Sequence, residues 1–535
     1  MSEPPSTPSP STPSLSTASA WPGAVSAGLH SALCRRIPPA LPAAELEPLT
    51  TELVASLERG ELTLPLSPER RRLAEASGWL TGDDSPLLIQ GDRIGWRRWL
   101  QAMEEVVEAL VSRCALPPPD ADPLTAPAPP ETLNAEQRAA VCALDHSSVV
   151  LLSGGPGTGK TSTVVELLRR AEARHPDLRI GLAAPTGKAA RRLGDAVLAS
   201  RAPLPCSTLH RWLESGVRGF GRDADRPLDL DLLVIDEMSM LDLALTQALI
   251  AALPLGCRLV LVGDPAQLPP VGSGAVWHRL QQDDVRPRFG EGAVHLVQTY
   301  RNRGALATLA AALRDGGMPA FCNAIDALPV DGNVQVHRAS PWRLPSLLRQ
   351  RWLKRLERLS VLAEGLDRCE AVHLAAEAQP LLEAMEADLV LCSRRRGPWS
   401  LEDLNRSLLG ETNAADPSRW PVGLPVICGG NQPELGLANG DLGVVVGRGD
   451  ARRLLFRSVN SEGLVQVQRL HPARLRRLEP ALALTIHRAQ GSEADRVMVL
   501  WPQTLDPEGC GDHDRRLLYT AITRTRASLD LVTVP

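Results

Sequence analysis

A glycine-rich segment with one lysine and one threonine could bind phosphate. It reads Gly154-Gly155-Pro156-Gly157-Thr158-Gly159-Lys160-Thr161-Ser162 and fits the pattern G-x-x-x-x-G-K-[ST]. It follows the apolar run 148–153 and precedes a helical pattern, the context in which backbone N–H groups and a helix N-terminus face an anion. We expect the whole segment to bind ATP, with Lys160 on the β/γ-phosphates and Thr161 on Mg²⁺. The alternative is a chance Gly-rich turn, which is disfavoured because only three of the 58 basic residues are lysines.

Polar residues also follow two further apolar runs. Asp236 and Glu237 follow 232–235, and buried acids are costly unless they are used. We expect Asp236 to hold Mg²⁺ and Glu237 to orient or deprotonate the attacking water. Gln267 lies just after the run 258–263. It could sense the γ-phosphate or the water, or it could belong to a Pro-rich turn that closes a strand.

The elements that position these residues are predicted from alternating apolar runs and helical patterns. Such alternation is typical of buried parallel strands in a doubly wound α/β domain. A first set of strands is expected at 148–153, 179–184, 232–236 and 258–263. A second set is expected at 387–392, 483–486, 497–500 and 529–534. Short β-like runs with Gly/Asn turns predict a small β insertion at about 420–480.

Composition divides the chain further. The Ser/Thr/Pro-rich start cannot bury enough apolar surface to offset the entropy of ordering, so residues 1–29 are predicted to be disordered. Residues 30–115 have helical apolar spacing and predict a small helical domain. Residues 116–132 are Pro-rich and predict a linker. The main body is predicted to form two domains, 133–300 and 301–535.

Charge, hydropathy and cysteine spacing exclude several classes of protein. The net charge of −4 argues against a uniformly basic nucleic-acid binder but allows a local basic groove. No apolar run approaches the ~18 residues of a membrane helix, and no secretion signal is visible. The ten cysteines form no C-x-x-C pair, which argues against a zinc ribbon or a disulfide scaffold. We expect a cytoplasmic protein without a membrane anchor.

Seven motifs in order resemble superfamily 1 helicases, and more closely the RecD group, the alpha subunit of exodeoxyribonuclease V. The resemblance covers residues 133 to the C-terminus. It implies two RecA-like P-loop NTPase domains, with an SH3-like insertion in the second. The segments that carry it are 154–161, 185–190, 235–241, 263–274, 299–301, 485–493 and 519–526.

The resemblance also implies roles around ATP. Gln137 would read the adenine edge and Glu493 would contact the ribose. Arg301 and Arg524 resemble the two arginine fingers, which would place ATP between the domains and link their closure to hydrolysis. The implied catalytic set is Lys160, Glu237, Gln267, Arg301 and Arg524.

Other matched positions resemble contacts to single-stranded DNA. They are hydroxyl, imidazole and ammonium side chains suited to sequence-neutral phosphate contacts, namely Thr186, Lys188, Thr208, His210, Thr485 and His487. The alternative for each threonine or histidine is a cap or packing role. The group often has Lys-Ser where this chain has Arg488-Ala489, which puts a DNA contact there in doubt.

The resemblance implies a 5′→3′ DNA helicase that acts on DNA ends in double-strand break repair and recombination. It also implies a heterotrimer with RecB-like and RecC-like subunits, in which the N-terminal domain docks on the gamma subunit. No nuclease cluster is visible in this chain. Two alternatives stay open. One is a self-sufficient or RNA-directed motor, and the other is a structural subunit whose nucleotide site only stabilises assembly.

Overall fold

The structure is a computed structural model that describes residues 21–82, 84–116, 128–199, 203–216, 219–300, 304–329, 332–459, 465–505 and 509–535. The chain divides into two compact units. One comprises Met1–Glu104 with Val271–Gly274, and the other comprises Glu105–Pro270 with Ala275–Pro535. The predicted boundaries at 115 and 300 stay predictions.

The first unit combines helices with a small antiparallel sheet of order β1-β3-β2. Leu46, Leu49 and Leu53 recur at helical spacing and are buried in its core together with Trp79. Residues 21–29 are helical rather than part of a disordered tail, because the apolar side chain of Leu29 packs on this core. Residues 1–20 lie outside the described residues. The elements are α1 (Trp21–Arg36), α2 (Ala43–Glu58), β1 (Thr63–Pro65), α3 (Pro68–Ser77), β2 (Leu87–Gln90), β3 (Arg93–Trp96) and the start of α4 (Arg97–Cys114).

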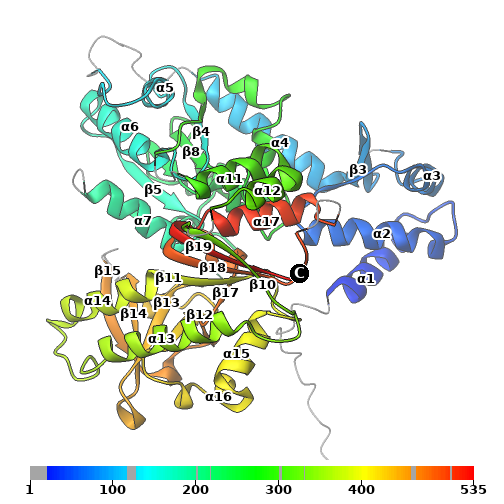
Figure 1. Cartoon of the computed structure of the whole chain (residues 1–535). Helices are drawn as coiled ribbons and strands as arrows, with labels where there is room; N and C mark the ends of the chain where they lie inside the picture. The colour runs from blue at the N-terminus through cyan, green and yellow to red at the C-terminus, as the bar shows by residue number, and fades with distance from the viewer. Residues whose placement is uncertain are drawn as a thin grey trace, which may run out of the picture. The chain divides into compact units, whose positions relative to one another are not determined.

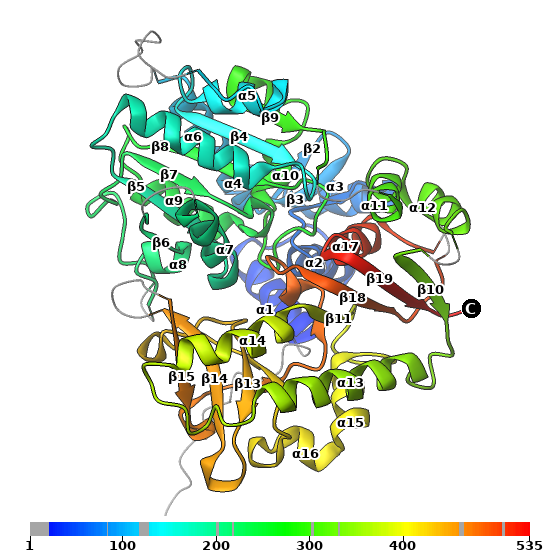
Figure 2. The ribbon, with the colours of Figure 1, turned by 60° about the vertical axis from the view of Figure 1, so that its left-hand side comes forward.

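The second unit begins with an α/β domain around a parallel sheet of order β6-β5-β7-β8-β4-β9. Four of its strands are buried along their whole length, as near-continuous apolar runs require. Helix α6 lies along β4 (Figure 2). The elements are α5 (Ala135–Ala143), β4 (Val149–Gly154), α6 (Lys160–Arg174), β5 (Ile180–Ala184), α7 (Gly187–Leu198), β6 (Cys206–Thr208), α8 (Leu209–Trp212), β7 (Leu232–Ile235), α9 (Leu243–Ala252), β8 (Arg258–Gly263), α10 (Val276–Leu280) and β9 (Ala293–Leu296).

A second α/β domain follows, with a parallel sheet of order β10-β19-β18-β11-β17. Helices α11, α12 and α17 lie beside one another (Figure 1) and pack on one apolar core with this sheet. The elements are α11 (Ala305–Asp315), α12 (Gly317–Asp326), β10 (Val334–Arg338), α13 (Ser346–Leu362), α14 (Leu374–Glu386), β11 (Asp388–Cys392), α15 (Leu401–Leu409), α16 (Glu411–Ala415), β17 (Leu484–Thr485), β18 (Ala494–Trp501), α17 (Asp512–Ile522) and β19 (Thr525–Thr533).

An antiparallel sheet of order β15-β14-β13-β12-β16 is inserted between α16 and β17. Helix α14 lies against its strands (Figure 2) and shares a core with them. The strands are β12 (Pro425–Cys428), β13 (Leu442–Val446), β14 (Arg453–Val459), β15 (Val465–Leu470) and β16 (Leu478–Pro480). The predicted α/β class with two parallel sheets and a β insertion is confirmed, whereas the SH3-like character of the insertion stays a prediction. Among the described residues, no helix is both long and apolar enough to cross a membrane.

Candidate nucleotide and nucleic-acid site

The phosphate-binding segment forms the turn between β4 and α6. Gly157 and Gly159 take φ of 74° and 84°, values that side chains other than glycine rarely adopt. The Thr158 hydroxyl donates a hydrogen bond of 2.9 Å to the Gly155 carbonyl and fixes the turn from inside. The free N–H groups of the first turn of α6 therefore end at a rigid loop, which is the arrangement that binds an anion.

Lys160 lies within the same loop. Its ammonium donates hydrogen bonds to the carbonyls of Gly154 at 2.7 Å and Gly155 at 2.9 Å. The ammonium is thus held beside the backbone N–H groups, and both kinds of donor can meet the same phosphate. Thr161 and Ser162 follow at the start of α6.

The two acids after β7 are buried, with exposed fractions of 5% for Asp236 and 6% for Glu237. The Glu237 N–H donates to Asp236 Oδ1 at 2.9 Å, and Glu237 has φ of 58°, which is uncommon for a residue with a side chain. Burial and the neighbouring Glu237 raise the pKa of Asp236, while Arg192 and Lys160 oppose this rise. Two carboxylates held together in a buried site need a cation, which a metal ion or an arginine can supply.

The segment after β8 joins the two α/β domains. Asp264 Oδ2 accepts hydrogen bonds from Gln267 Nε2 at 3.2 Å and from the Tyr519 hydroxyl of α17 at 3.1 Å. The Leu268 N–H donates to Thr520 Oγ1 at 2.9 Å. Burial and the nearby Asp264 raise the pKa of Tyr519, so the phenol keeps its proton and donates. A shift of the second domain would therefore act directly on this segment.

The Gln137 side chain folds back onto the N-terminus of α5, where Asn134 is the N-cap. It forms a capping box with Asn134, and its Nε2 lies 3.4 Å from the Thr158 carbonyl of the phosphate-binding loop. The side chain is thus fixed against the loop, whereas its contact with adenine stays a prediction.

Of the two predicted arginine fingers, the structure describes only Arg524. Arg301 lies outside the described residues. Arg524 is only 2% exposed and donates to the carbonyls of Thr520 at 3.1 Å and Ser492 at 3.3 Å. Its guanidinium is thus held by the backbone of its own domain, and its role as a finger stays a prediction.

Arg314 is a further cation near the phosphate-binding loop, and it belongs to none of the sequence motifs. It ends α11 in the second domain, yet its Nη1 would lie 3.3 Å from a Cβ built on Gly155 in the phosphate-binding loop. Its bond to Asp315 raises the pKa of Arg314, so the side chain is a permanent cation. In a chain so rich in arginine, no sequence signal separated this residue from surface charges.

Glu493 lies between two arginines. Its carboxylate accepts from Arg192 Nη1 of α7 at 2.9 Å and from Arg526 Nε at 3.2 Å. The structure thus places this carboxylate on two guanidinium groups. The ribose contact implied by the resemblance stays a prediction.

The predicted DNA-contacting threonines all act as local hydrogen-bond acceptors. The hydroxyl of Thr186 accepts from the Ala189 N–H, that of Thr208 from the Arg211 N–H, and that of Thr485 from the Arg488 N–H. Thr186 and Thr208 thus fill the cap role left open by the sequence, whereas Thr485 ends β17 and precedes the N-cap residue of the next short helix. Contact with DNA is compatible with these hydrogen bonds and stays a prediction.

The two histidines differ in surroundings. His487 stacks on His513 at 6.1 Å between ring centroids, and burial together with His513 lowers its pKa to about 4. His210 is exposed, with its ring 6.4 Å from that of Phe220. Contact with DNA stays a prediction for both histidines.

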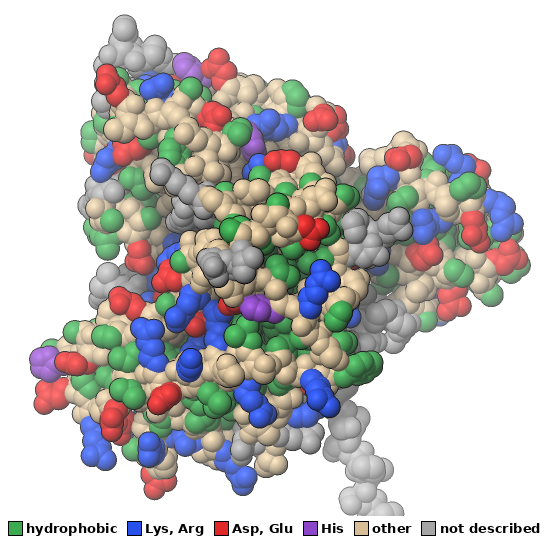
Figure 3. Space-filling model, in the orientation of Figure 1, with side chains coloured by type: hydrophobic (Ala, Val, Ile, Leu, Met, Phe, Trp, Pro, Cys, Tyr) green, Lys and Arg blue, Asp and Glu red, His purple; other side chains and the backbone are tan. Residues whose placement is uncertain are grey.

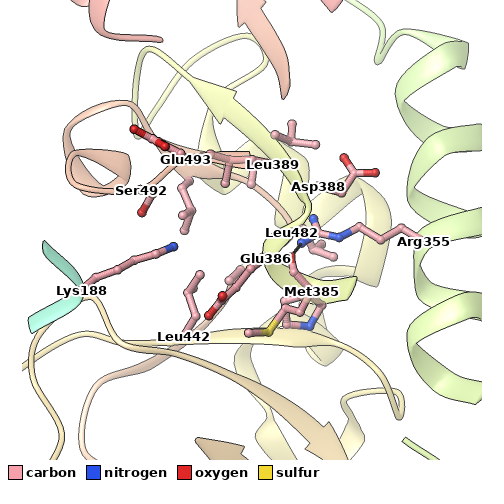
Figure 4. A pocket seen from close by; sticks show the side chains of 15 residues that line it. Lys188, Arg355, Met385, Glu386, Asp388, Leu389, Leu442, Leu482, Ser492 and Glu493 are labelled. Atoms are coloured by element: carbon pink, nitrogen blue, oxygen red, sulfur yellow. Dashed lines mark hydrogen bonds between the residues drawn. The ribbon is translucent and has the colours of Figure 1, made fainter. Parts of the chain in front are cut away.

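Lys188 points into a space between the two α/β domains (Figure 4). No hydrogen bond or ion pair joins its ammonium to another described residue. Burial lowers its pKa, and Glu386 opposes this effect. The ammonium is thus available to pair with an anion that approaches α7.

The neighbouring cavity has a volume of about 870 Å³. Blue side chains gather in the hollow between α7 and α14 (Figure 3). The charged residues that line the cavity are the basic Lys188, Arg191, Arg192, Arg358, Arg457 and Arg526 and the acidic Asp195, Glu383, Glu386, Glu493 and Asp495.

The sequence matches known families in two places. Residues 137–273 match the AAA domain, and residues 480–532 match the UvrD-like helicase C-terminal domain. A crystal structure of Bacteroides Pif1 bound to ssDNA is similar with a TM-score of 0.44 and 19% identity, over 75% of this chain and 92% of that one.

Curated relatives are more similar. The RecBCD enzyme subunit RecD of Mycolicibacterium smegmatis is 34% identical over 74% of this chain and 70% of its own length. The subunit of the same name from Mycobacterium tuberculosis is 33% identical, over 85% and 78%. The ATP-dependent RecD2 DNA helicase of Deinococcus radiodurans is 32% identical, over 86% of this chain and 59% of its own length. With its motifs in order and relatives of this identity over most of both chains, this chain belongs to the RecD family.

Proposed function

We propose that this chain is an ATP-dependent helicase that translocates along single-stranded DNA in the 5′→3′ direction. The observation that carries the proposal is the segment after β8, where Asp264 meets Tyr519 and Leu268 meets Thr520. A nucleotide site that spans two domains in this way can convert hydrolysis into relative domain movement. A structural subunit would need no such connection, so this observation disfavours that alternative.

ATP would bind with its phosphates on the loop between β4 and α6. Mg²⁺ fits the residues present, because Thr161 and Asp236 can each offer an oxygen and Mg²⁺ usually keeps few protein ligands. The described residues hold no cluster of three or more His, Cys, Asp and Glu side chains suited to a metal. When bound, Mg²⁺ would neutralise charge on the phosphates.

Hydrolysis would use residues from both domains. Glu237 would orient the attacking water and accept its proton, and Gln267 would report on the γ-phosphate. The second domain would supply positive charge through Arg301, Arg524 and Arg314. Because Arg314 already lies beside the loop, it is the cation that the geometry favours.

Single-stranded DNA would lie along the cavity beside α7. Lys188 and the surrounding arginines offer charge without base-specific donors in a fixed pattern, which suits a sequence-neutral backbone contact. Thr186 and Thr208, at the starts of α7 and α8, would add hydroxyl contacts near helix N-termini.

We propose that the chain works on DNA ends with RecB-like and RecC-like subunits, and that its first unit docks on the latter. Support comes from the RecBCD subunits among its relatives. The RecD2 helicase match supports a second candidate, a motor that acts without these partners.

Strand separation on tailed duplexes tests the function. The isolated full chain and Lys160→Ala should be compared on duplexes with a 5′ or a 3′ single-stranded tail. We expect ATP-dependent unwinding of the 5′-tailed duplex alone, absent in the variant. Unwinding of only the 3′-tailed duplex would contradict the polarity. Copurification of RecB-like and RecC-like chains with a tagged chain tests the assembly, and their absence would favour the self-sufficient motor.

A further inference from the structure

Arg192 contacts three carboxylates that come from both α/β domains. Its Nη2 lies 3.2 Å from Glu237 Oε1 and 3.8 Å from Asp236 Oδ2, both after β7. Its Nη1 lies 2.9 Å from Glu493 Oε1 of the second domain. One guanidinium therefore joins the proposed catalytic base to a residue of the other domain.

These contacts are more buried than ordinary surface ion pairs. The three carboxylate side chains are only 7–11% exposed, and that of Arg192 is 31% exposed. Buried carboxylates that lose their cation are costly, so a movement that removes one partner redistributes the others.

The helix that carries Arg192 also reaches the proposed DNA cavity. Lys188 lies one turn earlier on α7 and lines the same cavity as Arg192. Between them Arg191 pairs with Asp441, just before β13 of the insertion, at 3.3 Å. An anion that enters the cavity thus meets the same helix face that holds Glu237.

We propose that Arg192 is a positioning residue that couples DNA occupancy of the cavity to the readiness of Glu237 for hydrolysis. With Glu493 engaged, Arg192 holds Glu237 in an ion pair, so that the guanidinium occupies the carboxylate oxygen. When DNA and nucleotide draw the domains together, the Arg192–Glu493 contact shifts and Glu237 becomes available to the water. This proposal rests on the proposed function of the chain as a DNA-dependent ATPase.

The test compares the ratio of ATPase rates with and without oligo-dT in the full chain. For Arg192→Ala we expect this ratio to fall at least about fivefold, the lower range of couplings between sites. Arg192→Lys keeps one charge but cannot bridge both domains, so its ratio should also fall. A ratio close to the wild-type value, or an equal loss of both rates, would overturn the proposal.

A double-variant cycle identifies the partner. If Arg192 acts through Glu493, then Glu493→Gln should lower the ratio and add little to Arg192→Ala. Independent, additive effects would contradict the coupling. Arg169→Ala, on the exposed side of α6, is the matched control and should keep the wild-type ratio.

A binding measurement separates coupling from loss of catalysis. Because the proposal has DNA and nucleotide draw the same two domains together, we expect oligo-dT to change the affinity of the wild-type chain for fluorescent mant-ADP with Mg²⁺. We expect this change to disappear in Arg192→Ala, which should still bind the nucleotide. An unchanged DNA effect in the variant, or no effect in the wild type, would overturn the coupling. Failure of oligo-dT to stimulate wild-type ATPase would instead count against the proposed function.

Discussion

The phosphate-binding loop and the cavity beside α7 both offer positive charge, but they hold it in different ways. In the loop, backbone N–H groups and Lys160 are fixed by the turn and by bonds to Gly154 and Gly155. In the cavity, long arginine side chains pair with carboxylates such as Glu386, Asp441 and Glu493. The loop is preorganised for one defined anion, whereas the proposed strand in the cavity would exchange with these carboxylates as a partner of the arginines.

The largest effect is expected at the phosphate-binding loop, where the positive charge is fixed. Lys160→Ala should lower ATPase activity by a factor of about 10² or more, because it removes a preorganised charge at the phosphates. Steady-state ATPase assays measure the effect, and circular dichroism checks that the fold is kept. Activity within tenfold of wild type would contradict the role of the loop.

The next largest effect is expected at the cavity beside α7, where the ion pairs can exchange. Lys188→Ala should weaken binding of oligo-dT about tenfold at low salt and reduce the salt slope by about one, because one phosphate contact is lost. Fluorescence anisotropy at several salt concentrations measures both quantities. Lys354→Ala, an exposed lysine on α13, is the control and should leave both unchanged. Equal effects of the two variants would mean that the cavity does not hold the strand.

A smaller effect tests whether the hydroxyl at the start of α7 serves the fold. Thr186→Ala should lower the free energy of unfolding by about 1 kcal/mol, because the cap on the Ala189 N–H is lost. Thr186→Ser keeps the hydroxyl and should therefore keep most of this free energy of unfolding. Urea unfolding compares the variants, and oligo-dT binding shows whether the hydroxyl also contacts DNA. No change in stability for Thr186→Ala would contradict the cap.

The last expected effect is a dependence of the free energy of unfolding on pH at the half-buried His487. The pKa of His487 is about 4 in the folded chain, because burial and His513 lower it, against about 6.5 when unfolded. The unfolded state therefore binds more protons between these values, and this contribution to stability is lost as pH falls from about 6.5 to 4. Urea unfolding gives the free energy of unfolding at pH 7 and at pH 5. Between these two values it should fall less for His487→Gln than for the wild type. The variant His146→Gln, at an exposed histidine, should behave as wild type. A fall in the free energy of unfolding for His487→Gln as large as that of the wild type would contradict the lowered pKa of His487.

Local signals predicted much of the molecule. The apolar runs ending at Ser153, Ile235 and Gly263 correspond to β4, β7 and β8 within a residue or two, because buried parallel strands leave a continuous apolar pattern. The loop around Lys160 was found because its function needs residues close together in the sequence. The small sheet of the first unit was missed, since its strands are only three or four residues long.

Long-range contacts could not be predicted. Arg192 meets Glu493 and Asp264 meets Tyr519 across about half of the chain, and neither pair leaves a local pattern. The abundance of arginine added to the difficulty, because Arg192 and Arg314 look like surface charges in the sequence. Lys188 was easier to single out, since lysine is rare in this chain.

The most direct test of the account is the ATPase rate of the full chain as oligo-dT is added. If the nucleotide site is shared by two domains that also enclose the strand, the rate should rise to a plateau, and Lys160→Ala should stay flat. A wild-type rate that does not respond to DNA, with nucleotide binding intact, would contradict the claim that the two sites work as one motor.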